Sequence, residues 1–436
     1  MNLATGPGGL GAASPRAGTG ERSAARRPGR PAGLRDILAG ALAVLDRPLT
    51  PYYLILGITT LLIALGLVMV LSTSTADSLI HGWPPYAGFQ HQLVGVAIGI
   101  PCMWLAARAR PSLFRAAAYP LLFVSVIGLL LVLVMGATSG GAERWLQVGP
   151  VTIQPSELAK LAFVLWGADL LARKERLRQL DDWRQLLIPL LLGTGALSML
   201  VMLGDDLGTT FVLLVIFLAL LWVIGTPARF YMGILAMIGL VLLILVVVAG
   251  YRLHRLTVFL DPRGGPLGQD MQGIQGKWAV GSGGWFGVGL GASRQKWGWV
   301  PNDTTDFIFA IVGEELGLVG TLCVSFLYGA LAYAGLRIAR RVDDTFIRLA
   351  AAGATAWIVI QAMVNIGAVL GLLPITGVPL PLVSSGLSSL LVTMAALGML
   401  MSFAKREPGA ADALAAGGPG GFRRVLSWLG LAHRPQ

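Results

Sequence analysis

The stretch FYMGILAMIGLVLLILVVVAG, residues 230–250, runs for 21 residues without a charged side chain. The hydrocarbon core of a bilayer is about 30 Å thick, and roughly 20 apolar residues are needed to cross it as a helix. This stretch is therefore predicted to be a transmembrane helix. The segment that follows it, residues 251–305, is polar and rich in glycine, which predicts a long loop outside the hydrocarbon.

The same apolar pattern recurs along the chain, where hydrophobic residues make up 55% of the sequence and charged residues only 13%. A β-barrel is excluded, because its strands would alternate polar and apolar residues. Several stretches are rich in Gly and Ala, which let helices pack closely in a bundle. We predict an all-α polytopic membrane protein with ten transmembrane helices, in which the long loop lies between spans 7 and 8. The predicted spans are approximately 52–73, 89–107, 116–136, 157–172, 186–204, 207–225, 230–250, 307–336, 348–372 and 382–404.

Basic residues are unevenly distributed between the two sides of the predicted membrane. With ten spans both termini share one side, and 25 of the 33 Lys and Arg residues fall there. The positive-inside rule then places both termini in the cytoplasm and residues 251–305 outside. The net charge of +11 reflects this asymmetry and anionic lipid rather than nucleic acid. Six basic residues in the long outer loop break the trend and suggest an anionic ligand.

The two ends of the chain differ in composition from the membrane domain, residues 51–405. Residues 1–50 are rich in Arg, Ala, Gly and Pro, without the apolar core of a signal peptide, and are predicted to be a disordered cytoplasmic extension. Residues 406–436 form a similar cytoplasmic tail. Short surface helices are expected near residues 33–45 and 422–431.

Several kinds of site are excluded by the residue types and their spacing. Cys102 and Cys323 both lie in predicted spans, so neither a disulfide framework nor a zinc site is expected. The four histidines are scattered, with no HExxH spacing. A nucleotide-binding motif ending at Gly276–Lys277 would need glycine where Met271 stands. A carboxylate is therefore the best candidate for acid–base chemistry.

The strongest local signal is DTTDFIFAIVGEELG, residues 303–317. Asp306 stands at the lip of a predicted membrane helix, where lipid does not solvate a charge, so either pairing or chemistry must explain it. An aspartate at a helix start can also be a simple N-cap or dipole partner, and both interpretations are kept. Glu314 and Glu315 lie farther into the helix, and structural salt bridges to basic residues are the favoured interpretation for them.

The long loop combines glycines with hydrogen-bond donors. Its glycines, between positions 281 and 291, indicate a flexible loop, a close approach to a bulky ligand or a re-entrant segment. The donors beside them suit pyrophosphate and sugar hydroxyls. These donors are Arg252, Arg255, Gln272, Gln275, Lys277, Arg294 and Lys296.

A second outer loop, GAERWLQVGPVTIQPSELAK, covers residues 141–160. Lys160 lies just inside the fourth predicted span, where it could extend to the interface and do nothing else. Alternatively, Arg144 and Lys160 line the entrance at which an anionic head group is held. In the turn GDDLGTT, residues 204–210, capping is the default role of the two aspartates.

A third cluster, GLLPITGVPLPLVSSGLSSL, residues 371–390, places three prolines beside membrane spans. Broken backbone at membrane depth is tolerated only where protein or a water-filled cavity covers it. The cluster is therefore predicted to be a discontinuous segment that lines a site. By the same argument Gln361 and Asn365 are expected to face the interior of the bundle.

Taken together, these segments resemble the SEDS family, the FtsW/RodA/SpoVE peptidoglycan glycosyltransferases, over roughly residues 50–405. The resemblance is strongest to FtsW, the division branch. Seven motifs occur in register, including the two loop glutamines. The other six are RW…GP…QPSELAK (144–160), DLGTT (206–210), YR…R (251–255), GSGGWFGVGLG…QK (281–296), TDFIFAIVGEELG (305–317) and PITGVPLPLVSSGLSS (374–389).

The resemblance implies polymerisation of lipid II at the outer face of the bacterial cytoplasmic membrane, with Asp306 at the position of the family's essential aspartate. A divalent cation could assist, although no ligand pair is obvious and no cofactor is expected with certainty. A class B penicillin-binding protein and other divisome or elongasome membrane proteins are the implied partners. The candidate substrate-binding residues are Arg144, Lys160, Arg252, Arg255, Gln272, Gln275, Lys296, Glu314, Asn365, Ser384 and Ser388.

Two other functions fit the same sequence. A lipid II flippase would also need a charged cavity and basic contacts to a head group, but it would not need one aspartate at the outer lip. A non-catalytic scaffold of the division or elongation machinery would tolerate loss of Asp306 but not loss of the helix faces that dock its partners.

Overall fold

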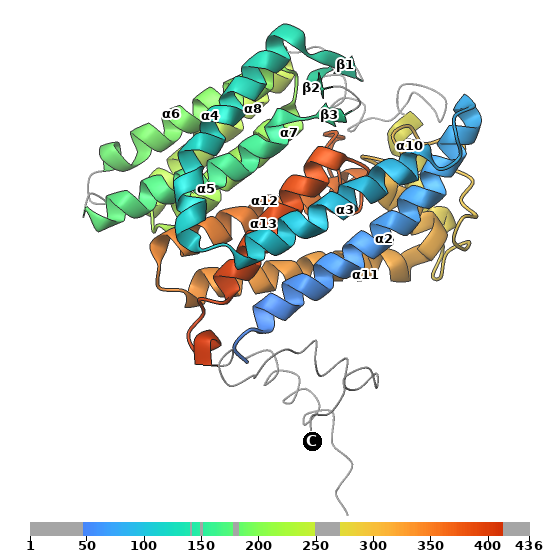
Figure 1. The fold of residues 1–436 in the computed structure, drawn as a ribbon. Coiled ribbons are helices and arrows are strands. Elements are labelled where there is room, and N and C mark those ends of the chain that lie inside the picture. The colour runs from blue at the N-terminus through green and yellow to red at the C-terminus, as the bar shows by residue number, and fades with distance from the viewer. Residues whose placement is uncertain (1–46, 140–141, 149–150, 178–182, 249–270, 413–436) are drawn as a thin grey trace, which may run out of the picture. The chain divides into compact units, whose positions relative to one another are not determined.

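The computed structural model describes residues 47–139, 142–148, 151–177, 183–248 and 271–412. A helix lies at each of the ten predicted stretches (Figure 1), and most begin or end within a few residues of the expected positions. These helices are α2 (Thr50–His81), α3 (Ala87–Arg108), α4 (Pro111–Met135), α5 (Pro155–Arg176), α6 (Trp183–Leu203), α7 (Leu207–Val223), α8 (Ala228–Val248), α11 (Ile308–Arg341), α12 (Thr345–Val369) and α13 (Leu387–Ala404). The surface helices expected near 33–45 and 422–431 lie outside the described residues.

Local sequence explains where several helices begin. Helices α2, α4 and α5 each carry a proline in the first turn, where the missing N–H has no helical partner to lose. Asp206 caps α7 by accepting a hydrogen bond from the backbone N–H of Thr209 at 3.0 Å. Asp344 caps α12 in the same way through the N–H of Ile347 at 3.1 Å. The capped turn expected at the start of α7 is confirmed.

One helix and one small sheet were not expected. The helix α10 (Met271–Ser282) lies within the predicted long loop. Strands β1 (Ala137–Ser139), β2 (Ala142–Val148) and β3 (Val151–Ile153) form an antiparallel sheet in the order β1-β2-β3. The purely helical prediction is therefore wrong for the second outer loop, where this sheet lies. Strands β1 and β3 have three residues each, which is too little alternation to be recognised, and main-chain pairing with β2 decides them.

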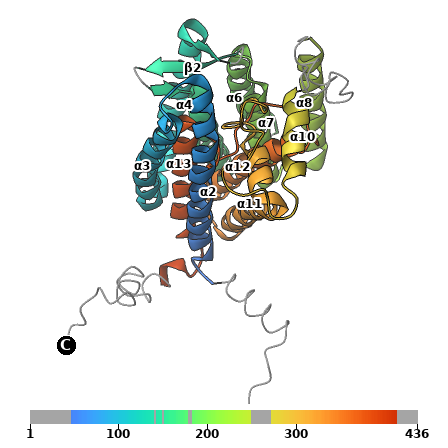
Figure 2. The same cartoon turned by 90° about the vertical axis from the view of Figure 1, so that its right-hand side faces the viewer.

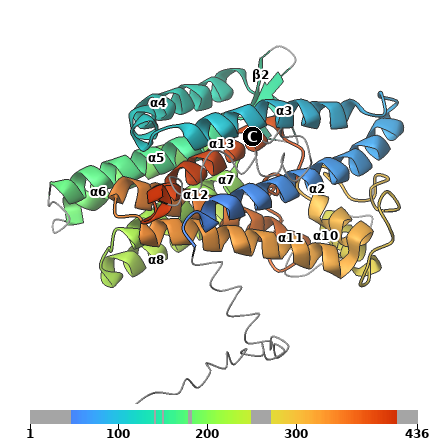
Figure 3. The same ribbon diagram turned by 60° about the horizontal axis from the view of Figure 1, so that its bottom comes forward.

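Helices α12 and α13 form the centre of the bundle. The most apolar window of α13 is 78% buried and that of α12 is 72% buried, against 6% for α8. Helix α13 packs against α2, α3 and α5, while α12 packs against α5, α7 and α11 (Figure 3). Helix α8 lies at the edge of the bundle (Figure 2). Small residues permit the close packing, as expected: a Cβ on Gly398 of α13 would lie 2.3 Å from the carbonyl of Met103 in α3.

Seven helices in the described part of the chain are long and apolar enough to cross a membrane. The apolar parts of α6 and α7 are shorter, Leu187–Leu203 and Leu207–Val223. Helix α5 carries buried charges, among them Glu157, Lys160 and Asp169, that lower its hydropathy. The structure is therefore a multi-helix membrane fold.

The two ends of the bundle differ in character. At one end lie the small sheet and α10 (Figures 1 and 3). The α6–α7 turn and the start of α11 lie at the same end. Buried carboxylates with two arginines each lie in other parts of the fold: Asp169 pairs with Arg115 and Arg173, and Glu407 pairs with Arg337 and Arg341.

Candidate active site around Asp306

Asp306 lies in the turn that leads into α11, and its residue is partly exposed. It is not the helix cap: the N-cap residue is Phe307, which makes no side-chain cap hydrogen bond. Phe307 and Ile308 are buried, so they pin the start of the helix into the core. The capping interpretation of Asp306 is therefore not supported, and its position in the loop needs another explanation.

The main chain around Asp306 is held by the segment between α12 and α13. The Ser384 hydroxyl donates to the carbonyl of Thr305 at 2.6 Å, and the Ser385 N–H donates to that of Thr304 at 2.9 Å. On α12, Asn365 Nδ2 donates to the carbonyl of Asp306 at 2.7 Å. Three hydrogen bonds on three successive carbonyls thus fix the backbone that carries the aspartate.

The same segment, residues 370–386, is largely non-helical, as the proline cluster predicted, and its stretch Leu380–Ser384 is buried. Side chains of neighbouring helices take the role that helix hydrogen bonds would otherwise play. Asn365 Nδ2 donates to the carbonyl of Val378 at 2.7 Å, and Gln361 Nε2 donates to that of Pro379 at 3.0 Å. Because these carbonyls are satisfied, the broken backbone can lie inside the bundle.

Arg144 reaches this region from β2. Its Nη2 donates to the carbonyl of Asp205 at 2.9 Å, and its Nη1 lies 3.9 Å from Asp206 Oδ1. The Asp206 carboxylate also accepts hydrogen bonds from the Thr209 hydroxyl at 2.7 Å and from Gln154 Nε2 at 3.3 Å. The α6–α7 turn therefore orients the guanidinium, while most of the bonding capacity of Asp206 is used by the helix cap.

Asp306 and Arg144 both approach Gly377. The φ of Gly377, +71°, is strained for a residue with a side chain. A Cβ built on Gly377 would lie 3.5 Å from Asp306 Oδ2 and 3.8 Å from Arg144 Nη1. The carboxylate and the guanidinium thus flank a single backbone position. This arrangement brings a base and a cation to one place, suited to removing a proton beside a developing negative charge.

Lys160 does not line an entrance. Its side chain is 1% exposed, and its Nζ donates to Glu157 Oε1 and to Gln361 Oε1, both at 2.8 Å. The ammonium also lies 5.2 Å from the ring centroid of Trp357. Both the snorkelling interpretation and the entrance interpretation are therefore wrong, because a carboxylate three residues earlier on α5 holds the charge inside the bundle.

Lys296 was expected to contact pyrophosphate, and the structure gives it a different role. Its Nζ is buried and donates to Ser72 Oγ at 2.8 Å, to the carbonyl of Gly291 at 2.7 Å and to Glu315 Oε1 at 3.1 Å. The salt bridge expected for Glu315 is thereby confirmed. In this arrangement Lys296 ties the outer loop to α2 and α11 instead of facing a ligand.

Glu314 also has a structural role. Its carboxylate accepts hydrogen bonds from the Ser293 hydroxyl and from the backbone N–H groups of Arg294 and Gln295. The residue is 2% exposed, so the prediction that it binds substrate is corrected: it caps a turn of the loop. Two adjacent carboxylates on α11 thus hold the same loop through different partners.

The other candidates are spread around the site. Gln272 donates to the carbonyl of Pro301 at 3.1 Å, and Gln275 is buried on α10. Ser388 accepts a hydrogen bond from the N–H of Gln154 at 3.2 Å and donates to the carbonyl of Thr152 at 3.4 Å, joining α13 to the sheet. Arg252 and Arg255 lie outside the described residues.

The sequence does not identify two residues of the candidate site around Asp306. The sequence predicts only a capping role for Asp206, which also lies beside Arg144. It predicts Gly377 only as part of a broken segment. Within the described ranges, no group of three or more His, Cys, Asp or Glu residues could hold a metal ion. The suggestion of a divalent cation stays a prediction.

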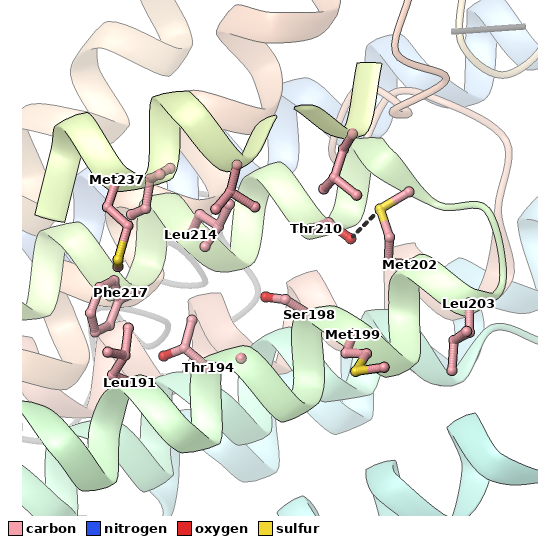
Figure 4. A pocket seen from close by; sticks show the side chains of 14 residues that line it. Leu191, Thr194, Ser198, Met199, Met202, Leu203, Thr210, Leu214, Phe217 and Met237 are labelled. Atoms are coloured by element: carbon pink, nitrogen blue, oxygen red, sulfur yellow. Dashed lines mark hydrogen bonds between the residues drawn. The ribbon is translucent and has the colours of Figure 1, made fainter. Parts of the chain in front are cut away.

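An apolar cavity of about 440 Å³ lies between α6, α7 and α8. Figure 4 shows Thr194 and Ser198 on one wall and Leu214 and Phe217 on the facing wall. At one end the Thr210 hydroxyl lies 3.9 Å from the sulfur of Met202 and donates to the carbonyl of Asp206 at 2.9 Å. The cavity therefore begins beside the turn that orients Arg144.

Comparison with known proteins identifies relatives across nearly the whole membrane domain. The family model described as "Cell cycle protein", FtsW/RodA/SpoVE, matches residues 52–408. The probable peptidoglycan glycosyltransferase FtsW of Mycobacterium tuberculosis is 40% identical over 386 residues, which are 88% of this chain and 73% of that protein. The stage V sporulation protein E of Bacillus subtilis is 36% identical over 360 residues, 82% of this chain and 97% of that protein.

Solved structures show the same fold. A chain from a peptidoglycan synthase complex that coordinates polymerization and crosslinking matches with a TM-score of 0.66 and 30% identity, over 80% of this chain and 96% of that chain. The rod shape determining protein RodA of Thermus thermophilus matches with a TM-score of 0.59 and 29% identity, over 81% of this chain and 96% of that chain.

Proposed function

Because this chain belongs to the FtsW/RodA/SpoVE family, we propose that it is a peptidoglycan glycosyltransferase that polymerises lipid II into glycan strands at the outer face of a bacterial cytoplasmic membrane. Relatives named as probable peptidoglycan glycosyltransferases align with most of its length. The observation that carries the proposal is the position of Asp306 and Arg144 on either side of Gly377.

In the proposed reaction Asp306 acts as a general base. It takes the proton from the 4-hydroxyl of the acceptor N-acetylglucosamine, and that oxygen attacks the anomeric carbon of the donor N-acetylmuramic acid. The bond from this carbon to the pyrophosphate oxygen breaks, and its electron pair leaves with undecaprenyl pyrophosphate. The anomeric centre is inverted. The hydrogen bonds to the Thr304, Thr305 and Asp306 carbonyls support this role, since a base must be held in place.

Arg144 is the cation proposed to stabilise the charge that develops on the leaving pyrophosphate. A guanidinium held in advance of the reaction needs little rearrangement as that charge appears. The hydrogen bond from Arg144 to the carbonyl of Asp205 supplies this orientation. Lys160 and Lys296 do not contact the pyrophosphate in this proposal, because each is buried in an ion pair of its own.

The apolar cavity supports a substrate that carries a lipid. Its walls come from three helices of the bundle, and the polar side chains among them are Thr194, Ser198 and Thr210. Methionines 199, 202 and 237 also line it, and their flexible side chains adapt to irregular apolar shapes. A water-soluble sugar nucleotide would gain nothing from such a surface beside the site.

We also propose that the chain crosses the membrane ten times, with both termini in the cytoplasm. Helix α11 supports this orientation. Its last turn carries Arg340 and Arg341, whereas Asp306 precedes its first turn. Basic residues favour the cytoplasmic side. Asp306, the small sheet and the α6–α7 turn are then placed at the outer face.

A single-span class B transpeptidase is the proposed partner, and division is the proposed setting. The solved complex that this chain resembles is described as coordinating polymerization with crosslinking. Crosslinking of a nascent strand requires a transpeptidase beside the polymerase. Several of its relatives are FtsW proteins, which supports the division branch.

The experiment that tests the function is polymerisation of purified lipid II by the purified chain together with its transpeptidase, read as glycan strands on a gel. Asp306→Asn keeps the shape of the side chain but removes its basicity, so we expect loss of strand formation without loss of fold. Retained polymerisation would exclude Asp306 as the base.

Asp303→Asn is the matched control, because it removes a carboxylate from the same loop. It is expected to keep most of the activity. The same assay separates the other candidate functions, since neither a flippase nor a scaffold lengthens glycan. Strand formation by the wild-type chain contradicts both, and vesicle transport of lipid II without polymer would favour the flippase.

A further inference from the structure

Helix α11 is interrupted at Gly317, whose φ of 67° and ψ of −162° are not helical. An interruption removes the hydrogen bonds that would run across it from each N–H to the carbonyl four residues earlier. The carbonyls of Glu314 and Glu315 and the N–H groups of Leu318 and Val319 therefore lose their helical partners. At a membrane such groups must be satisfied from elsewhere.

The partners come from the loop segment Gly283–Leu290, which we name the glycine hairpin. It runs alongside the break in α11 and supplies both donors and acceptors. The four hydrogen bonds join Val288 N to Glu314 O at 2.9 Å, Gly289 N to Glu315 O at 3.2 Å, Leu318 N to Gly284 O at 2.9 Å and Val319 N to Trp285 O at 3.2 Å. The hairpin thus replaces the missing section of the helix ladder.

Glycine is required for this contact. A Cβ on Gly283 would lie 1.9 Å from the carbonyl oxygen of Gly313, and one on Gly287 would lie 2.1 Å from that of Glu315. Real Cβ atoms do not approach oxygen so closely, so any larger residue would push the hairpin off the helix. The glycines at these two positions therefore serve backbone packing and not flexibility.

The outward face of the hairpin is apolar. Trp285 is 71% exposed and Phe286 is 83% exposed. No Asp, Glu, Lys or Arg occurs from Trp278 to Ser293. Trp285 also lines one shallow pocket with Leu318 and Thr321 of α11. The exposed apolar residues of α11 that continue this surface are Leu318, Val319, Leu322 and Phe326.

The position of the break along α11 indicates its depth in the membrane. From Leu316 to Leu336 the helix has no charged residue, and Arg337 follows. At 1.5 Å per residue these 21 residues span about 30 Å, the thickness of the hydrocarbon core. Gly317 and the hairpin beside it then lie at the outer edge of that core, where tryptophan is favoured.

We propose that the glycine hairpin is inserted into the outer leaflet, with Trp285 and Phe286 in contact with lipid, and that it anchors the loop that carries Asp306 to the membrane. The inference rests on the proposed crossing of α11. The hairpin is connected to the loop through Glu314 and Glu315, which hold Ser293 and Lys296.

Two features favour contact with lipid. The four backbone groups of α11 that lose their helical partners at the break are paired within the chain, which a lipid-immersed segment requires and a water-exposed loop does not. The apolar face is also continuous with an exposed apolar side of α11, whose Leu322 and Phe326 lie within the proposed span.

The test is the accessibility of a nitroxide spin label in vesicles of phosphatidylcholine and phosphatidylglycerol. The two cysteines, Cys102 and Cys323, are replaced by alanine, and Phe286→Cys provides the labelling site. Collisions with oxygen, which concentrates in lipid, are compared with collisions with a water-soluble nickel chelate. No lipid-linked substrate is needed, so failure of this test is distinct from failure of the proposed function.

Two controls set the scale. The natural Cys323, retained in a chain that carries only Cys102→Ala, is exposed on α11 below the break and reports lipid. Asn302→Cys, exposed in the loop ahead of Asp306, reports water. The proposal expects Phe286→Cys to resemble Cys323, with an oxygen-to-nickel ratio several-fold above that of Asn302→Cys. A ratio equal to that of Asn302→Cys, or protection from both reagents, would overturn it.

Discussion

The side-chain amide of Asn365 on α12 donates one hydrogen bond to the carbonyl of Asp306 and one to that of Val378, each at 2.7 Å. One buried amide therefore holds together the loop that carries the proposed base and the broken segment that contains Gly377. This bridge adds to the anchoring of the start of α11, whose cap residue, Phe307, is buried but makes no side-chain cap bond.

Replacing Asn365 with alanine is expected to lower the polymerisation rate constant about 100-fold with a smaller change in KM, because misplacing a reacting group by about 1 Å costs that much. Steady-state kinetics on purified lipid II measures the split. Gln92→Ala is the control, since Gln92 bonds Ser384 and Gly386 of the same segment at 3.3 Å without touching Asp306. Equal losses in the two variants would argue against a positioning role.

Arg144→Ala is expected to lower kcat/KM about 100-fold, because removing one group that stabilises a transition-state charge has an effect of this size. Arg144→Lys keeps the charge but loses the forked donor geometry that reaches the Asp205 carbonyl, so an intermediate loss is expected. Arg229→Ala, which replaces an exposed basic residue in the first turn of α8, is the control. Its activity should remain near that of the wild-type chain.

Replacing Lys160 with methionine leaves the Glu157 carboxylate buried without its cation. Thermal unfolding in detergent should then show a loss of about 3–5 kcal/mol, as expected when one partner of a buried ion pair is removed. The double variant Lys160→Met with Glu157→Gln should recover a large part of that loss. If the double variant is as unstable as the single one, the pair is not the cause.

Asp303 makes the stability of the outer loop depend on pH. Burial and the neighbouring Asp77 raise the pKa of Asp303 to about 7, although backbone N–H groups and Lys296 partly oppose this. Between the ordinary pKa of 3.8 and about pH 7, the Asp303 carboxyl keeps a proton in the folded chain that it has released in the unfolded chain. Stability contributed by this group is present at low pH and is lost as pH rises through about 7.

Asp303→Asn removes that dependence. The melting temperature of the variant minus that of the wild-type chain should therefore increase between pH 5 and about pH 7 and stay constant above that pH. Melting curves across this range, with Asp343→Asn as an exposed control at the far end of α11, provide the measurement. A difference that does not change with pH would show that Asp303 titrates normally.

Gly283 and Gly281 form a matched pair of neighbouring sites. A Cβ on Gly283 would collide with the Gly313 carbonyl, whereas one on Gly281 would meet nothing within 4 Å. Gly283→Ala should therefore lower stability by about 2 kcal/mol or more. Gly281→Ala, within α10, should be neutral or gain up to about 1 kcal/mol of helix propensity. Similar melting temperatures for both variants would contradict the packing of the glycine hairpin on α11.

Much of the architecture follows from local sequence. Long uncharged runs predict helices because lipid leaves the backbone no other way to satisfy its polar groups, and each of the ten predicted stretches is helical. Asp306 was singled out for a similar reason, since a carboxylate at the lip of a membrane helix has a large solvation cost. The break in the backbone between α12 and α13 was also visible in its prolines.

The partners of the charged residues were decided by tertiary structure alone. Sequence spacing shows that Lys160 and Lys296 are basic and near the membrane, but not that Glu157 and Glu315 hold them inside the protein. Pairing across the bundle depends on which helix faces meet, and composition does not contain that information. The sequence therefore determined the helices and singled out Asp306 as a candidate. Only the folded chain brought Arg144 to the same region, because the two residues come from segments 162 residues apart that main-chain and amide hydrogen bonds bring to Gly377.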